Sequence, residues 1–120
     1  MTSEQAQKFC DRWLPAWTGN RPEVLIEFYA DHAFYRDPAR PTGIRGKQDL
    51  FKYFSRLLVR YSNWTWQAIE VFPAEHGFIL KWEAQDAGKV FQGMDIVEIL
   101  DGKIIRNEVY FDPSVLKQSP

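Results

Sequence analysis

The spacing of the apolar residues changes close to the middle of the chain. Before residue 62 most of them recur every three or four positions, which is the period of one face of an amphipathic helix. From Asn63 onward they alternate with polar residues, which is the period of a strand with one buried face. Helices followed by a run of hairpin strands predict an α+β fold, in which three helices cover one face of a mostly antiparallel sheet.

The first predicted helix begins after a capping residue, Thr2 or Ser3, and carries its apolar residues on one stripe. Pro15 lies inside this pattern and lacks the backbone N–H that a helix interior needs. The helix is therefore expected to kink or end near Leu14, and the direction of Trp17 is left open.

A second, shorter helix is predicted from Pro22 to about Asp31, and the third has the clearest spacing, from Leu50 to Tyr61. Between them, residues 33–37 alternate as a short strand. Residues 38–46 are expected to be irregular because they contain two prolines and two glycines. Four hairpin strands then follow, separated by turns at residues 73–77, 86–88 and 101–102.

Length and charge exclude several classes of protein. With 120 residues, the chain is expected to form a single domain over residues 1–120. A net charge of -1 provides no field that would attract nucleic acid, and no apolar run approaches the roughly 20 residues that span a membrane. The N-terminus lacks the pattern of a secretory signal, and the single cysteine, Cys10, has no disulfide partner. These features predict a cytoplasmic protein that binds neither nucleic acid nor membranes.

The unusual component is aromatic, because 5 Trp, 5 Tyr and 9 Phe make up 16% of the chain. Such side chains either fill a core or line a cavity. The alternation in the last strands places two polar side chains, Asp95 and Asn107, among inward-facing apolar ones. An unpaired buried carboxylate is costly, so Asp95 either finds donors, takes up a proton, or faces a cavity that holds water or ligand.

Both polar residues also have simpler interpretations. A bulge at Gly93 would turn the Asp95 carboxylate toward solvent or a cation. Asn107 either pairs with Asp95, lines the same site, or has a purely structural role.

Asp37 stands at the end of the first predicted strand and shares the inward parity of Tyr35, so a general base could stand there. The alternative is that Asp-Pro opens a turn and a neighbouring arginine pairs with the carboxylate. The arginines within reach in the sequence are Arg36, Arg40 and Arg45.

Other chemistries lack the residues that they need. His32 and His76 stand far apart, with no Cys or His at the spacing of a zinc site. The chain contains neither a nucleophile elbow nor a phosphate-binding glycine loop. We therefore expect neither a metal nor a cofactor. Asp112 precedes Pro113 at a predicted helix start and is interpreted as a cap.

The order helix, helix, strand, helix and strand meander, together with residues 28–31, 36–38, 43–46 and 101–105, resembles the SnoaL-like branch of the nuclear transport factor 2 superfamily. The resemblance covers nearly the whole chain. It implies a cone-shaped fold, in which a curved sheet wraps on three helices around a deep and mostly apolar pocket. This fold hosts isomerases, cyclases, hydrolases, dehydratases and pure binding modules.

By this resemblance, Asp37 corresponds to the general base of ketosteroid isomerase, and Asp95 to the protonated aspartic acid that donates to the substrate oxyanion. The oxyanion-binding tyrosine of that enzyme is replaced by Trp13, whose N–H donates once and cannot exchange a proton. This difference argues against steroid isomerisation. Limonene epoxide hydrolase is similar in fold, but Gly93 stands where it has an arginine, which argues against epoxide hydrolysis.

The resulting hypothesis is a cofactor-free isomerase, cyclase or lyase that holds a small apolar, carbonyl-bearing or polycyclic molecule. Asp37 would remove a carbon-bound proton and Asp95 would stabilise the enolate. The alternative is a binding or assembly module without catalysis, and under either hypothesis the resemblance implies a homodimer. The residues expected to line the pocket are Trp13, Tyr35, Phe54, Phe78, Trp82, Phe91, Val97, Asn107, Val109 and Phe111.

Overall fold

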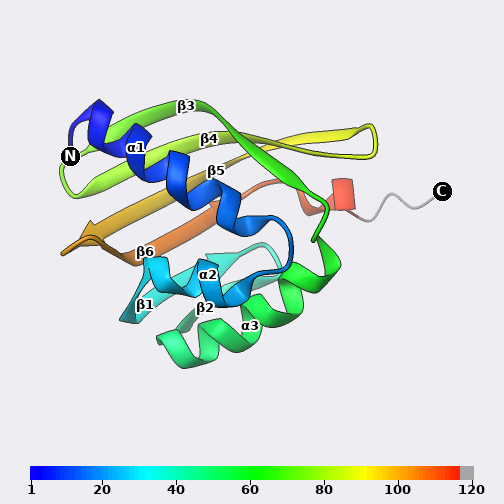
Figure 1. The fold of residues 1–120 in the computed structure, drawn as a ribbon, viewed down its shortest axis with the longest axis horizontal. Helices are drawn as coiled ribbons and strands as arrows, with labels where there is room; N and C mark the ends of the chain where they lie inside the picture. Colours follow the sequence, from blue (N-terminus) through cyan, green and yellow to red (C-terminus); the bar gives the residue numbers. More distant parts are fainter. Residues whose placement is uncertain (117–120) are drawn as a thin grey trace.

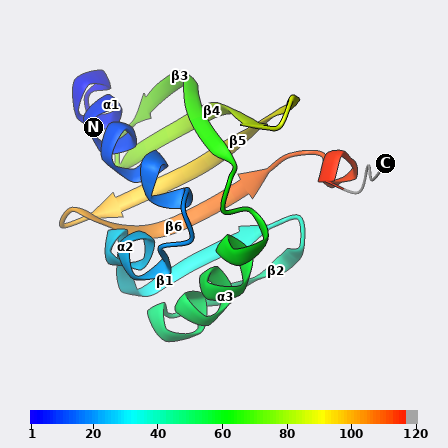
Figure 2. The same cartoon turned by 45° about the vertical axis from the view of Figure 1, so that its right-hand side comes forward.

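The computed structural model describes residues 1–116, which form a curved six-stranded sheet with three α-helices on one of its faces (Figures 1 and 2). The strand order is β2-β1-β6-β5-β4-β3, and only the β1·β6 pair is parallel. The predicted α+β class, with helices on a mostly antiparallel sheet, is confirmed. The elements are α1 (Ser3–Trp13), α2 (Pro22–Leu25), β1 (Tyr29–Asp37), β2 (Arg40–Arg45), α3 (Lys47–Arg60), β3 (Thr65–Ala74), β4 (Gly77–Asp86), β5 (Lys89–Leu100) and β6 (Lys103–Tyr110).

Helix α1 begins and ends where the sequence indicates. The Thr2 hydroxyl accepts a hydrogen bond from the Gln5 backbone, and the Gln5 side chain accepts one from the Thr2 backbone, which completes a capping box. The helix ends at Trp13, and the chain tightens into a 3-10 turn, Leu14–Trp17, around the proline. This turn buries Trp17 against the core, which settles the direction of its side chain.

Two predicted segments differ from the structure. Helix α2 ends at Leu25 and is followed by a 3-10 turn, and β1 already begins at Tyr29, so the expected helix end at Asp31 is wrong. The reason is that Tyr29 pairs with Ile104 of β6 and buries its side chain completely. Residues 40–45, expected to be irregular, form β2 against β1. A proline is tolerated there because β2 is an edge strand.

The C-terminal turn follows the interpretation of Asp112 as a cap. Its carboxylate accepts a hydrogen bond from the Ser114 backbone at 3.0 Å, at the start of a 3-10 helix, Pro113–Leu116.

The outer face of the sheet, opposite the helices, exposes Phe72, Met94 and Tyr110. The homodimer remains a prediction, and so does the cytoplasmic location. In residues 1–116, no helix has the length and apolarity that a membrane crossing requires.

Candidate functional site

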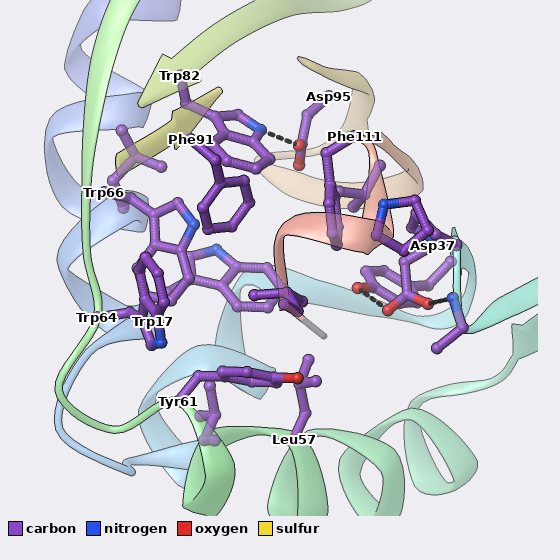
Figure 3. A pocket seen from close by; sticks show the side chains of 18 of the residues that line it. Trp17, Asp37, Leu57, Tyr61, Trp64, Trp66, Trp82, Phe91, Asp95 and Phe111 are labelled. Atoms are coloured by element: carbon purple, nitrogen blue, oxygen red, sulfur yellow. Dashed lines mark hydrogen bonds between the residues drawn. The ribbon is translucent and has the colours of Figure 1, made fainter. Parts of the chain in front are cut away.

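A cavity of about 400 Å³ lies between the helices and the sheet and is walled mainly by aromatic rings (Figure 3). All five tryptophans of the chain line it, together with three tyrosines and two phenylalanines. Among the lining residues that the structure describes, the only Asp or Glu residues are Asp37 and Asp95, and none is Lys, Arg or His. The lining consists of Trp13, Leu14, Trp17, Tyr35, Asp37, Pro38, Ala39, Tyr53, Leu57, Leu58, Tyr61, Trp64, Trp66, Trp82, Phe91, Asp95, Val109, Phe111, Pro113 and Leu116.

The structure brings the two predicted catalytic aspartates and six of the ten predicted pocket residues to this cavity. The six are Trp13, Tyr35, Trp82, Phe91, Val109 and Phe111. The other four do not line it. For the three that lie on strands, alternation gives the face of the sheet but not the depth beneath the helices; Phe78, for example, packs against Phe9 and Trp13. These four residues are Phe54, Phe78, Val97 and Asn107.

Sequence reasoning missed much of the cavity wall that the helices and β3 supply. Tyr53, Leu57 and Tyr61 follow each other at four-residue steps, so they form one stripe of α3 and its end, facing the cavity. That spacing was visible in the sequence, but it is equally typical of plain core packing. Trp64 and Trp66 reach the cavity at the beginning of β3, and no feature of the sequence separates them from core residues.

Asp95 points inward from β5 and is only 4% exposed. Its Oδ1 accepts a hydrogen bond from Trp82 Nε1 at 2.7 Å, and its Oδ2 accepts one from Asn107 Nδ2 at 2.9 Å. Asn107 Oδ1 in turn accepts from the Tyr29 hydroxyl at 2.8 Å. Asn107 therefore pairs with Asp95 rather than lining the cavity.

Burial raises the pKa of Asp95 to about 6, and the hydrogen bonds from Asn107 and Trp82 oppose part of that rise. The direction agrees with the hypothesis of a protonated acid. With a pKa of about 6, most Asp95 carboxyl groups are ionised at pH 7. A role as hydrogen-bond donor would therefore be available mainly below pH 6.

Gly93 makes room for the tryptophan that holds Asp95. The pairing of β5 with β4 is regular on both sides of Gly93, so the bulge considered from the sequence is absent there. A Cβ atom at Gly93 would lie 2.3 Å from Trp82 Cζ2 and 2.8 Å from the Tyr110 carbonyl oxygen. Both distances are far below van der Waals contact, so any side chain at this position displaces the indole.

Replacing Gly93 with alanine is expected to lower the free energy of unfolding by about 2 kcal/mol, because a methyl group is forced into a packed region. The same displacement weakens the Trp82–Asp95 hydrogen bond, so the indole N–H resonance of Trp82 should shift toward the position of a free indole. Urea unfolding and a nitrogen-proton correlation spectrum measure the two effects. Gln92→Ala, an exposed neighbour on the same strand, serves as control and should leave the resonance in place.

Asp37 is 5% exposed and accepts four hydrogen bonds. Its Oδ2 accepts from the hydroxyls of Tyr35 at 2.8 Å and Tyr53 at 2.6 Å. Its Oδ1 accepts from the backbone N–H groups of Ala39 at 2.9 Å and Arg40 at 3.0 Å. The last two bonds form the turn that Asp-Pro predicts. With four donors around it, Asp37 could serve as a base only after one tyrosine hydroxyl turned away.

The arginines near Asp37 do not neutralise it. Within residues 1–116, none of their side chains forms an ion pair or hydrogen bond with Asp37. Arg36 donates to the Pro41 carbonyl, and Arg45 donates to the His32 carbonyl. The Arg40 guanidinium lies over the Tyr53 ring, 5.5 Å from its centroid.

Trp13, which by the resemblance stands where the isomerase has its oxyanion-binding tyrosine, lines the cavity but is fully buried. Its Nε1 has no hydrogen-bond partner of acceptable geometry among the described residues. The group nevertheless lies near Tyr29, where burial raises the pKa of the phenol and the Trp13 N–H opposes part of that rise. In the described part of the chain, no three His, Cys, Asp or Glu side chains are grouped so that they could hold a metal ion.

Comparison with known families identifies the chain at the level of its fold and family. The model of the SnoaL-like domain matches residues 10–107. The chain belongs to the SnoaL-like family. This confirms the resemblance inferred from residues 28–31, 36–38, 43–46 and 101–105. A search of curated proteins returned no match for this SnoaL-like protein.

Solved structures confirm the fold of the SnoaL-like protein. A SnoaL-like protein of unknown function from Burkholderia thailandensis is 18% identical, with a TM-score of 0.80 over 93% of this chain and 98% of that one. A hypothetical protein from Catenulispora acidiphila, with a ketosteroid isomerase-like fold and in complex with trimethylamine, is 19% identical, with a TM-score of 0.77 over 93% and 92%. A de novo designed protein with a curved β-sheet is 18% identical, with a TM-score of 0.77 over 98% and 93%. At these identities the likeness concerns the fold alone.

Proposed function

We propose that this SnoaL-like protein binds a small organic molecule in the aromatic cavity. The observation that carries the proposal is the cavity itself, about 400 Å³ enclosed by ten aromatic side chains. Protein interiors are close-packed and contain few voids larger than a water molecule. A space of this size lies within the range of ligand pockets, roughly 300–1,000 Å³. A chain that needed these rings only for its core would close the space.

Filling the cavity is expected to weaken binding of the small molecule. Leu57 lines the cavity from α3, whereas Val59 on the same helix is 61% exposed. The probe is 2-tetralone, a compact neutral bicyclic ketone, and the measurement is saturation-transfer NMR with titration. The wild type and Val59→Trp should bind it alike, and Leu57→Trp should bind at least tenfold more weakly because the indole occupies the space. Equal binding by the two tryptophan variants would show that the ketone binds elsewhere.

A second candidate function is cofactor-free proton transfer on the bound molecule. It is favoured by Asp95, whose pKa of about 6 lies within reach of neutral pH, and by Asp37 in the lining of the same cavity. In this mechanism the Tyr53 hydroxyl turns away and Asp37 Oδ2 takes a proton from the carbon next to a carbonyl. The C–H electron pair becomes the enolate, and the protonated Asp95 donates a hydrogen bond to its oxygen. Return of the proton to another carbon completes an isomerisation without a cofactor.

Proton transfer is tested by exchange of the α-hydrogens of 2-tetralone with deuterium from the solvent. Asp37→Asn should lower the protein-dependent rate at least tenfold because an amide cannot take up the proton. Asp95→Asn should retain much of the rate since an amide still donates. The rate in the wild type should fall as the pH rises through about 6, the pKa of Asp95. Asp31→Asn, exposed on the same strand as Asp37, is the control. Exchange at the buffer rate with bound ketone would leave binding as the function.

A further inference from the structure

The cavity has an unbalanced set of charges. Two carboxylates line it, and each belongs to a residue that is at most 5% exposed. No Lys, Arg or His is among the described lining residues. Burying charge is costly, and an uncharged apolar guest would not offset that cost for either aspartate. Hydrogen bonds stabilise both carboxyl groups, but no cation among the described lining residues balances their negative charge.

The aromatic rings, like the carboxylates, favour a positively charged ligand. The face of an aromatic ring is negative, so a cation within about 6 Å of the centroid is attracted to it, most strongly by tryptophan. Five tryptophans converge on this cavity, and Figure 3 shows four of them opposite Asp37 in that view. The protein itself has such a contact on one of the lining tyrosines, because the Arg40 guanidinium lies 5.5 Å from the centroid of the Tyr53 ring. An anion in the cavity would be repelled by the two carboxylates.

The hydrogen bonds of the two aspartates indicate the kind of cation. Asp37 already accepts four hydrogen bonds, and each Asp95 oxygen already accepts one. The site thus offers charge and ring faces but few free acceptors. A cation that carries few or no N–H donors fits this arrangement, because it loses few or no hydrogen bonds when it leaves water.

We propose that the ligand of the cavity is a small organic cation, a quaternary or highly alkylated ammonium with apolar substituents. The inference rests on the proposed binding function and specifies its ligand class. The alkyl groups contact the rings, and the positive charge faces Asp95 and Asp37. The recognition is then made by electrostatic attraction within an apolar enclosure, without a fixed hydrogen bond.

The charge of Asp95 depends on the ionisable groups around it. They are Asp37 and Tyr29 of β1 and Cys10 of α1. Burial raises the pKa of Cys10 to about 12 and that of Tyr29 above its usual value, so both remain neutral at physiological pH. A bound cation favours the ionised carboxylate, so it should move the pKa of Asp95 below about 6, whereas an enolate would move it upward.

The test compares choline with 3,3-dimethyl-1-butanol, which has the same shape but carries carbon in place of the charged nitrogen. Calorimetric titration at pH 8 should show that choline binds at least tenfold more tightly than the alcohol. Choline keeps its charge at every pH, so its affinity should fall at pH 5, where Asp95 takes up a proton, while that of the alcohol stays constant. At pH 8, Asp95→Asn should lower the preference for choline over the alcohol by as much as the change to pH 5 lowers it in the wild type. Asp31→Asn should leave that preference unchanged.

The outcomes separate this inference from the proposed function. Equal or tighter binding of the alcohol would overturn the proposal of a cationic ligand. A preference for choline that is the same at pH 5 and pH 8 would overturn it too. Binding of 2-tetralone alone would also overturn it and would leave the cavity a binding site for neutral molecules. Because the pH comparison uses the wild-type protein, the inference stays falsifiable even where the Asp95 variant fails to fold.

Discussion

Replacing Asn107 with leucine is expected to destabilise the protein by roughly 3 kcal/mol at neutral pH, because two buried polar groups lose their partner. Asn107 donates to Asp95 and accepts from the Tyr29 hydroxyl, and all three side chains are buried. Removal of the amide also removes a hydrogen bond that holds down the pKa of Asp95. That pKa should therefore rise above about 6, and the destabilisation should be larger at pH 8 than at pH 5.

A double-mutant cycle separates this network from simple packing. Tyr29→Phe removes the hydroxyl that donates to Asn107, and in the wild-type background it leaves the Asn107 oxygen without a donor. In the Asn107→Leu background the hydroxyl is already without an acceptor, so its removal should cost less or should stabilise. Urea unfolding of the four proteins measures the coupling. Additive effects of the two substitutions would contradict the network.

The contribution of Asp95 to the stability of the protein is expected to fall as the pH rises from about 4 to about 6. Burial raises the pKa of this carboxyl from 3.8 in the unfolded reference to about 6 in the folded protein. Between these values the folded state binds more protons than the unfolded state, so the free energy of unfolding decreases with increasing pH. The loss is on the order of 3 kcal/mol and is complete above the folded pKa.

Other carboxyl groups titrate in the same range, so the effect is measured as a difference. The free energy of unfolding of the wild type minus that of Asp95→Asn should decrease between pH 4 and pH 6 and stay level from pH 7 to pH 8. Asp31→Asn, an exposed substitution on β1, provides the matched control. A flat difference for Asp95→Asn would contradict the raised pKa.

The sequence predicts the class of fold and the inward direction of both aspartates because these follow from local periodicity. Strand parity is a property of neighbouring residues, so Asp95 and Asp37 could be placed on the inner face without knowledge of the partner strands. The Pro15 break and the Thr2 cap follow from backbone chemistry within one turn of helix. These features needed no tertiary contact.

The remaining features depend on contacts between distant segments. The early start of β1 at Tyr29 comes from pairing with β6, and β2 forms because β1 offers it an edge. The depth of a side chain beneath the helices also depends on contacts between distant segments. Phe78 and Phe91 look alike in the strand pattern, yet of these two only Phe91 reaches the cavity. The partners of Asp37 could not be predicted either, since Tyr53 arrives from a helix whose position relative to β1 is set by the whole core.

Carbon-detected NMR of the Asp95 carboxyl group during a pH titration tests whether this residue is a buried acid at the wall of the aromatic cavity. The midpoint should lie near pH 6 in the free wild-type protein and should be lower once choline is bound. A midpoint near 3.8, the value of an ordinary exposed aspartate, would show that burial does not raise the pKa of Asp95.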